Sequence, residues 1–171
     1  VVWTLLAFLS ASAMRVFRPL PLSNDSFQYL TVAEHARHDH QLTTSLVYYD
    51  TERSHGRIPA PLTTFPVGYP FLLSILSFWN NFEGTARALS AVCYAGTATL
   101  LVCALIVAGV TVFLRQLALL LFVTNVVALS YATAVLTEPL YLLLSTGAVV
   151  GLLWAESSKL PKRVVIVRAV I

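Results

Sequence analysis

Charge is scarce in this chain. Only 11% of its 171 residues are Asp, Glu, Lys or Arg, whereas 57% are hydrophobic, and the mean hydropathy is +0.77. This composition lies outside the range of ordinary soluble domains. It predicts an integral membrane protein. Together with the placement of the hydrophobic runs and charges, it leads us to expect an all-α fold, namely a multi-span helical bundle with an extracytoplasmic loop that carries juxtamembrane helices.

Cysteine is scarce as well, and several common motifs are missing. Cys93 and Cys103 are ten residues apart, about 15 Å along one helix, so they do not bridge each other within it. The sequence contains no Gly-rich phosphate loop, no cysteine pair with zinc spacing and no nucleophile elbow. The formal net charge of +3 comes without a basic cluster interleaved with aromatics, so no nucleic-acid partner is expected.

The hydrophobic runs predict the order of segments. They are a first helix over 1–18, an extracytoplasmic loop over 19–84, spans over 85–108, 116–136 and 138–155, and the start of a further span over 164–171. We expect both ends to be truncated, since Val1 lies inside an apolar run and the only methionine is Met14. A signal peptide is the competing interpretation of the N-terminal run.

Two helices are expected within the loop. Between Ser26 and Arg37 an apolar residue recurs at every third position, which predicts an amphipathic helix suited to a bilayer surface. The apolar segment 66–79 has 14 residues, too few to cross a core of about 30 Å. We interpret it as an interfacial or re-entrant helix, with aromatics suited to the headgroup zone: Tyr69, Phe78 and Trp79.

The number of crossings decides where two lone acids emerge. Residues 116–155 contain one charge, Glu138, and must fold back near Pro139 because a single helix of 40 residues would be about 60 Å long. If segment 66–79 does not cross, Glu138 emerges on the same face as Asp25; if it does cross, they lie on opposite faces. Basic residues after the later spans place the loop outside: Arg115, Lys159, Lys162 and Arg163.

Asp25 stands at the start of the amphipathic segment, beside a membrane edge. One interpretation is that it caps the helix. The other is that its carboxylate is a general base, which accepts the proton of an acceptor hydroxyl. Tyr29 lies one helical turn later, where it would orient the acid, line a substrate groove or pack against the membrane face.

Four short stretches resemble a known family, in their order along the chain. They are Asp25-Ser26-Phe27-Gln28-Tyr29-Leu30 with Ala33, Thr64-Phe65-Pro66-Val67-Gly68-Tyr69-Pro70-Phe71-Leu72-Leu73, Ala86-Arg87-Ala88-Leu89-Ser90, and Thr137-Glu138-Pro139-Leu140-Tyr141. Together they are similar to GT-C membrane glycosyltransferases, most of all to the protein O-mannosyltransferase and lipid A aminoarabinose transferase superfamily.

The resemblance implies an inverting transfer of sugar from a polyprenyl-phosphate carrier to a lipid, glycan or protein acceptor. In that family a catalytic acid lies in the first extracytoplasmic loop, and Asp25 matches it. Glu138 corresponds loosely to a second acid near the outer end of a later helix. The implied setting is a multi-pass protein among membrane lipids, in a bacterial plasma membrane rather than the endoplasmic reticulum.

The leaving group of such a reaction is a lipid phosphate, which needs cationic donors. Arg57 and Arg87 are the candidates, although both residue types also mark membrane interfaces, and Arg87 is expected to snorkel outward from the start of its span. Tyr29 and Tyr69 are the other candidate substrate-binding residues. The polar cluster Glu34, His35, His38, Asp39 and His40 is better explained as a hydrated helix end than as a metal site, although a divalent metal stays open.

Two other functions remain open. A transporter or flippase fragment would use Glu138 to line a polar path, but the spans contain few polar residues. Asn125, Ser130, Thr133 and Thr137 are interpreted as packing residues that hydrogen-bond between helices. A non-catalytic lipid-binding membrane subunit is the third hypothesis, which an Asp25 directed away from any cavity would favour.

Overall fold

The computed structural model describes residues 1–18, 20–46, 54–62, 65–77 and 80–157. Their secondary structure consists of seven helices and two short strands. In chain order these are α1 (Val2–Phe17), α2 (Asn24–His38), β1 (Thr43–Thr44), β2 (Ala60–Pro61), α4 (Gly68–Leu76), α5 (Phe82–Val107), α6 (Val112–Thr124), α7 (Val126–Tyr131) and α8 (Glu138–Ser157). The prediction of a helical fold is confirmed for these residues. The further span predicted over 164–171 lies outside them.

The chain divides into two units. The bundle unit comprises Val1–Pro19, Ser90–Thr133 and Glu138–Ile171. The loop unit comprises Leu20–Leu89 and Ala134–Thr137. Helix α5 begins in the loop unit and continues through the bundle unit. Each unit has buried residues of its own, and each is described separately here.

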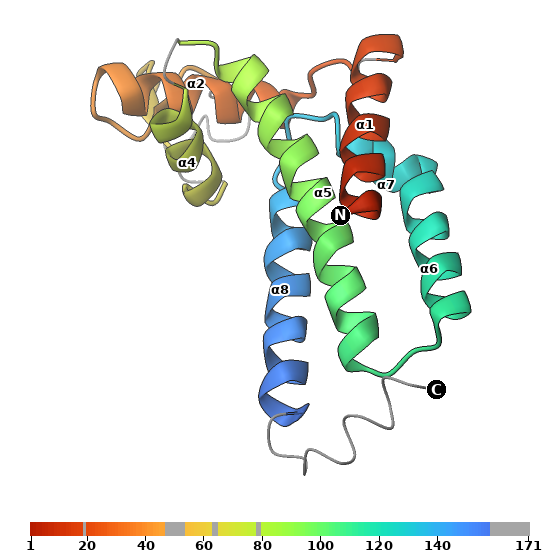
Figure 1. Ribbon diagram of the computed structural model, residues 1–171. Coiled ribbons are helices and arrows are strands. Elements are labelled where there is room, and N and C mark those ends of the chain that lie inside the picture. Colours follow the sequence, from red (N-terminus) through yellow and green to blue (C-terminus); the bar gives the residue numbers. More distant parts are fainter. Residues whose placement is uncertain (19, 47–53, 63–64, 78–79, 158–171) are drawn as a thin grey trace. The chain divides into compact units, whose positions relative to one another are not determined.

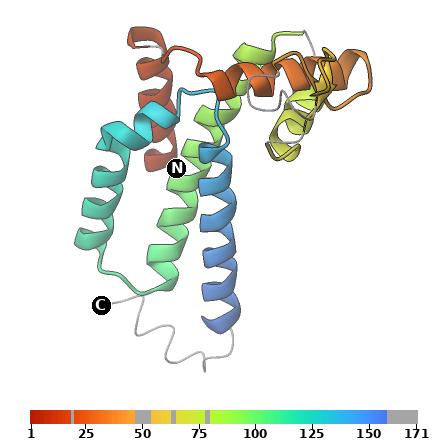
Figure 2. The same cartoon turned by 180° about the vertical axis from the view of Figure 1, so that it is seen from behind.

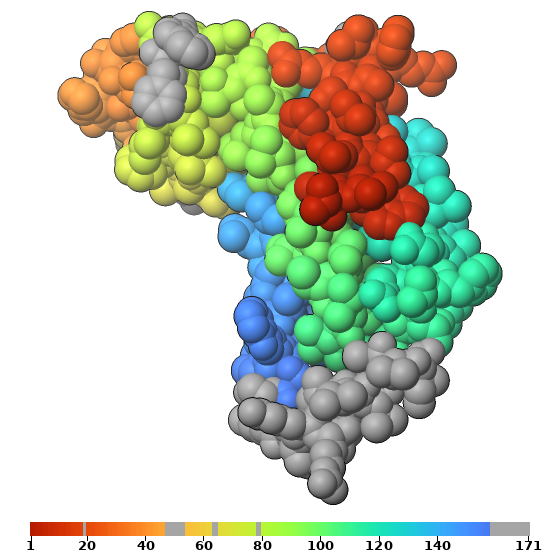
Figure 3. Space-filling model, in the orientation of Figure 1, coloured from red at the N-terminus to blue at the C-terminus, as the bar shows by residue number. Residues whose placement is uncertain are grey.

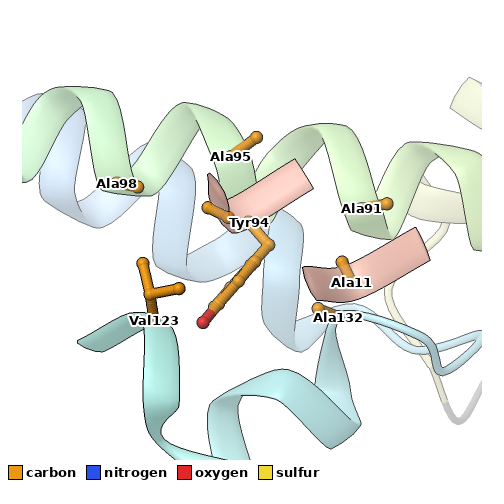
Figure 4. Close-up of a cluster of buried hydrophobic side chains, with 8 residues drawn as sticks. Ala11, Ala91, Tyr94, Ala95, Ala98, Val123 and Ala132 are labelled. Atoms are coloured by element: carbon orange, nitrogen blue, oxygen red, sulfur yellow. The ribbon is translucent and has the colours of Figure 1, made fainter. Parts of the chain in front are cut away.

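Small residues let α1 pack closely on α5 in the bundle unit. Ala7 and Ala11, one turn apart on α1, are both fully buried. They belong to a cluster whose other members are Ala91, Tyr94, Ala95, Ala98, Val123 and Ala132 (Figure 4). The hydroxyls of Thr4 and Thr99 are 2.8 Å apart and join the same two helices. Small side chains and hydroxyl bonds are the usual means of helix association in lipid.

Polar bonds connect α6 to its neighbours. Trp3 Nε1 on α1 donates to Gln116 Oε1 on α6 across 2.6 Å. Tyr94 extends from α5 and donates its hydroxyl to the backbone oxygen of Phe122 across 3.0 Å, with the two rings stacked 4.9 Å apart. In Figure 3 the atoms of α1 lie beside those of α5 and α6 on the visible face of this unit. These bonds fix the order in which α1, α5 and α6 pack.

Helices α5 and α8 run in the same direction and interlock (Figures 1 and 2). A Cβ atom added at Gly96 would lie 2.9 Å from Leu143 Cδ1, and one added at Gly147 would lie 3.5 Å from Leu100 Cδ1. Each glycine is therefore opposite a leucine of the other helix. Because both pairs are four residues apart along their helices, the two contacts are successive turns of one interface.

Two described helices are long and apolar enough to cross a bilayer. They are α5, with 26 residues, and α8, with 20. At 1.5 Å per residue their lengths are about 39 and about 30 Å, and they coincide with the spans predicted over 85–108 and 138–155. Within α8 only Pro139 and Val150 are buried, so most of its apolar side chains face outward. An apolar exterior of this kind suits contact with lipid.

The stretch 116–136, predicted as one span, contains a helix break. Helix α6 ends at Thr124, and Asn125 has extended backbone dihedrals. The Asn125 Oδ1 atom accepts a hydrogen bond from Ala128 N across 3.0 Å, so Asn125 is the N-cap of α7. The interpretation of Asn125 as a packing residue that hydrogen-bonds between helices is wrong, because its side chain caps the helix that follows it. Whether α6 and α7 together cross a bilayer stays a prediction.

The loop unit is built on α2. The helix predicted here is confirmed, but its predicted apolar face is wrong: the buried side consists of Ser26, Gln28, Tyr29, Val32 and Ala33, whereas Phe27 is exposed. Helix α4 packs against α2. Strands β1 and β2 pair antiparallel, with Thr43 opposite Pro61 and Thr44 opposite Ala60. With nine residues α4 is about 14 Å long, so it does not cross a bilayer by itself.

Candidate functional site

Asp25 lies in the first turn of α2 without capping it. The N-cap is Ser23, whose Oγ accepts from Ser26 N across 3.2 Å, while Ser23 N donates to Ser26 Oγ across 3.1 Å. These reciprocal bonds form a capping box that satisfies the helix end. The interpretation of Asp25 as the cap is therefore wrong.

The Asp25 carboxylate is half-buried. Among the residues that the structure describes, no hydrogen bond or ion pair engages it. A negative charge in the first turn is favoured by the partial positive charge of the helix N-terminus. The side chain is thus available to bind or accept a proton from a ligand.

Tyr29 and Tyr69, two predicted substrate-binding residues, are brought together. Their ring centroids are 5.2 Å apart in an edge-to-face arrangement, and the ring of Phe65 meets Tyr29 at 5.6 Å. Tyr69 is only 4% exposed, because its ring packs against that of Tyr29 on α2. Its predicted place in the headgroup zone stays a prediction. Phe78 and Trp79 lie outside the described residues.

The two predicted phosphate ligands have different surroundings. Arg87 does not snorkel outward, because its side chain is 8% exposed and its Nε donates to Glu83 Oε1 across 2.9 Å. Its Nη2 donates to the backbone oxygen of Leu20 across 2.9 Å. Arg57 is exposed, and its backbone N donates to Ser54 O. Arg57 is thus accessible to a ligand, whereas the guanidinium of Arg87 already has protein partners.

Gln28 is a polar residue of the loop unit that sequence reasoning missed. It is 3% exposed, and its Nε2 donates to Leu46 O across 3.0 Å. Its Oε1 is buried and has no hydrogen-bond partner among the described residues. A buried acceptor of this kind costs about 1–3 kcal/mol unless a ligand or water supplies a donor. The sequence does contain a signal for Gln28: it directly precedes the candidate residue Tyr29, in a segment predicted to be helical.

The histidine-rich end of α2 has a structural role at His35. Its Nδ1 lies 3.1 Å from Thr43 O and 3.0 Å from Thr43 Oγ1, and its Nε2 lies 3.3 Å from Ser45 Oγ. Both ring nitrogens therefore join α2 to β1 and its following residue. Over the described residues, no group of three or more His, Cys, Asp or Glu side chains is arranged to hold a metal ion.

Glu138 is the first residue of α8 and lies at an apolar cavity of the bundle unit. The side chain is exposed, and the cavity has a volume of about 210 Å³. The described lining residues are Tyr94, Ala128, Tyr131, Ala132, Glu138, Pro139, Tyr141 and Leu142. Glu138 is the only charged residue among them, so the cavity combines an apolar wall with one carboxylate.

The predicted site residues are divided between the two units. Asp25, Tyr29, Arg57, Tyr69 and Arg87 belong to the loop unit, and Glu138 belongs to the bundle unit. Their predicted meeting on a common face stays a prediction. Comparison of the chain with protein-family models, with curated proteins and with solved structures finds no match.

Proposed function

We propose that this chain is part of an inverting glycosyltransferase of the GT-C type. The enzyme would transfer a sugar from a polyprenyl-phosphate carrier to an acceptor hydroxyl at the extracytoplasmic face of a membrane, in a multi-pass arrangement in a bacterial plasma membrane. The two long apolar helices and the order of the four stretches that contain Asp25, Tyr69, Arg87 and Glu138 support this proposal.

The observation that carries the proposal is the state of Asp25. Helix capping would have been a purely structural role for Asp25, but Ser23 caps α2 instead. A half-exposed carboxylate without a described protein partner is suited to receive a proton from a hydroxyl within hydrogen-bond reach. Tyr29, one turn later, is held by the rings of Phe65 and Tyr69, so the helix that carries the acid is braced.

In the proposed reaction, Asp25 and Arg57 act on the acceptor hydroxyl and on the leaving phosphate. As the acceptor oxygen attacks the anomeric carbon, the Asp25 carboxylate takes the hydroxyl proton, and the bond from that carbon to the carrier phosphate breaks. The electron pair leaves with the phosphate, and attack from the opposite face inverts the anomeric centre. Arg57 is an accessible guanidinium that would stabilise the departing phosphate by charge-assisted hydrogen bonds.

Glu138 is proposed as a second acid of the same site. The support for this role is the order of the stretch Thr137-Glu138-Pro139-Leu140-Tyr141 after the three other stretches that resemble the family. Its apolar cavity with a single carboxylate suits a ligand with an apolar part and a hydroxyl or cationic group.

The test is Asp25→Asn in the full-length protein, assayed with a polyprenyl-phosphate sugar and a hydroxyl acceptor. Loss of a general base is expected to lower the rate by about 10²–10⁴-fold. Asp39→Asn, at the opposite end of α2, is the matched control and is expected to retain transfer. Unchanged transfer by Asp25→Asn at equal expression would remove the proposed base.

A non-catalytic lipid-binding membrane subunit is the second candidate. One observation favours it: within α8 only Pro139 and Val150 are buried, so most of its apolar side chains are exposed, as a lipid-binding surface requires. This candidate predicts that the wild-type protein transfers no sugar from any polyprenyl-phosphate donor while still retaining lipid. Transfer by the wild type excludes it.

A further inference from the structure

A cleft between α2 and α4 combines positive charge with an apolar wall. Its volume is about 520 Å³, and its described lining residues are Ala36, Arg37, His40, Phe71, Ser74 and Ile75. These described residues include an arginine and a histidine, and no carboxylate is among them. All of these residues belong to the loop unit.

One side of α4 is an exposed apolar stripe. Val67, Phe71 and Ile75 succeed one another at intervals of four residues and are 42%, 54% and 48% exposed. The opposite side, with Tyr69 and Leu73, is buried. The stripe is about 12 Å long, and its last two members form the apolar wall of the cleft.

Arg37 is fixed at the edge of this stripe. Its Nη1 donates to the backbone oxygen of Ser74 on α4 across 3.1 Å, which holds the half-buried guanidinium against the cleft. One of its five N–H groups is used in this described bond, and a guanidinium presents further donors in a rigid fork that fits phosphate oxygens.

His40 stands where a helix normally ends in glycine. It follows the C-cap Asp39 of α2 and has a φ of 56°, in the left-handed region. A residue with a Cβ atom is disfavoured there, and glycine is the common choice. The exposed imidazole of His40 therefore lines the cleft although its left-handed backbone conformation is energetically unfavourable for a residue other than glycine.

We propose that this cleft seats the headgroup of an anionic phospholipid. The phosphate contacts Arg37 and His40, and the acyl chains lie along Phe71 and Ile75. The pairing of an anion site with an apolar stripe matches the two ends of one lipid molecule, and a neutral apolar partner would leave the Arg37 guanidinium without a counterpart. The inference does not depend on glycosyl transfer.

The experiment uses the purified full chain in mild detergent, with bound lipid counted by native mass spectrometry. Phosphatidylglycerol and phosphatidylcholine with identical chains are titrated in parallel, and inorganic phosphate is added as a competitor. Arg37→Gln is expected to weaken phosphatidylglycerol retention by about five-fold or more, because one cation near a lipid surface contributes about 1 kcal/mol. Phosphatidylcholine has the same phosphate but also a choline cation that compensates its charge, so its retention is expected to fall less than that of phosphatidylglycerol.

His40→Gly separates binding from folding. Glycine relieves the left-handed backbone, so the thermal midpoint is expected to stay equal or rise, while phosphatidylglycerol retention falls. His55→Gly is the matched control, since His55 is also exposed with a positive φ of 48° but does not line the cleft. Arg18→Gln, an exposed arginine of the bundle unit, controls for loss of charge alone.

The apolar wall is tested with Phe71→Ser combined with Ile75→Ser, which is expected to weaken retention of both lipids. Three results would overturn the proposal. They are equal retention of the two lipids by the wild type, an equal loss of phosphatidylglycerol in Arg18→Gln and Arg37→Gln, and full displacement of lipid by inorganic phosphate at millimolar concentration.

Discussion

Arg87 Nε donates a hydrogen bond to Glu83 Oε1 across 2.9 Å, one turn earlier on α5. The two side chains differ in exposure, at 8% for Arg87 and 49% for Glu83. Arg87 also donates from Nη2 to the carbonyl of Leu20, 67 residues earlier in the chain. This arginine therefore joins the start of α5 to the segment that leads into α2, inside the loop unit.

Replacing the two partners is expected to have unequal effects. Glu83→Gln removes a half-exposed charge and should cost at most about 1 kcal/mol, as exposed ion pairs do. Arg87→Gln also loses the bond to the Leu20 carbonyl and should cost about 2–3 kcal/mol. The measurement is the unfolding free energy in detergent. Equal costs for the two variants would show that the Leu20 bond contributes nothing.

Hydropathy and length sufficed to predict the long helices. The predicted spans 85–108 and 138–155 coincide with α5 and α8, and the described part of segment 66–79 contains the nine-residue α4. The reversal expected before Pro139 is present, since α7 ends at Tyr131 and α8 begins at Glu138. These features depend on the average polarity of a local window, which a sequence displays directly.

Individual polar residues were harder to predict, because their roles depend on atoms distant in the chain. Arg87 reads as a snorkelling arginine until the carbonyl of Leu20 is known to lie beside it. Ser23 and Ser26 form the capping box of α2. Asp25 lies between them and is also a common capping residue, so the sequence alone favoured Asp25 as the cap. The relation of Asp25 to Glu138 was inferred from crossing parity alone and stays a prediction.

Asn125 is expected to set the boundary between α6 and α7. Asn125→Ala removes the bond to Ala128 N and should cost about 1 kcal/mol, the usual contribution of an N-cap. Asn125→Ser retains a capping oxygen and should cost only a few tenths. Thermal unfolding in detergent measures both variants.

Thr124→Ala is the control for this helix boundary. Thr124 lies at the same boundary, but its hydroxyl donates back to Leu120 O within α6. Its replacement should leave the midpoint nearly unchanged. A midpoint for Asn125→Ala equal to that of Thr124→Ala would contradict the capping role.

The contact of Gly96 with Leu143 predicts a steric limit between α5 and α8. Gly96→Leu places a large side chain where even a Cβ atom would lie 2.9 Å from Leu143 Cδ1, and overpacking should cost about 1–3 kcal/mol. Gly151→Leu on α8 is the control, since no atom lies within 4 Å of a Cβ there.

Both leucine variants gain helix propensity, so their difference reports packing alone. Gly151→Leu should be neutral or stabilising by up to about 1 kcal/mol. Adding Leu143→Ala to Gly96→Leu should recover part of the loss, because the opposing side chain becomes smaller. If Leu143→Ala recovers no stability in the Gly96→Leu variant, then the loss does not come from a clash with Leu143.

Tyr29 is expected to be the main aromatic support of α2. Tyr29→Ala removes the ring that meets both Phe65 and Tyr69 and should destabilise the loop unit by about 3–5 kcal/mol, as for other buried aromatics. Tyr29→Phe keeps both ring contacts and should cost clearly less. Phe27→Ala, an exposed aromatic on the same helix, should cost under about 1 kcal/mol. Hydrogen exchange of the α2 amides measures all three variants, and equal protection in Tyr29→Ala and Phe27→Ala would mean that the aromatic cluster does not hold the helix that carries Asp25.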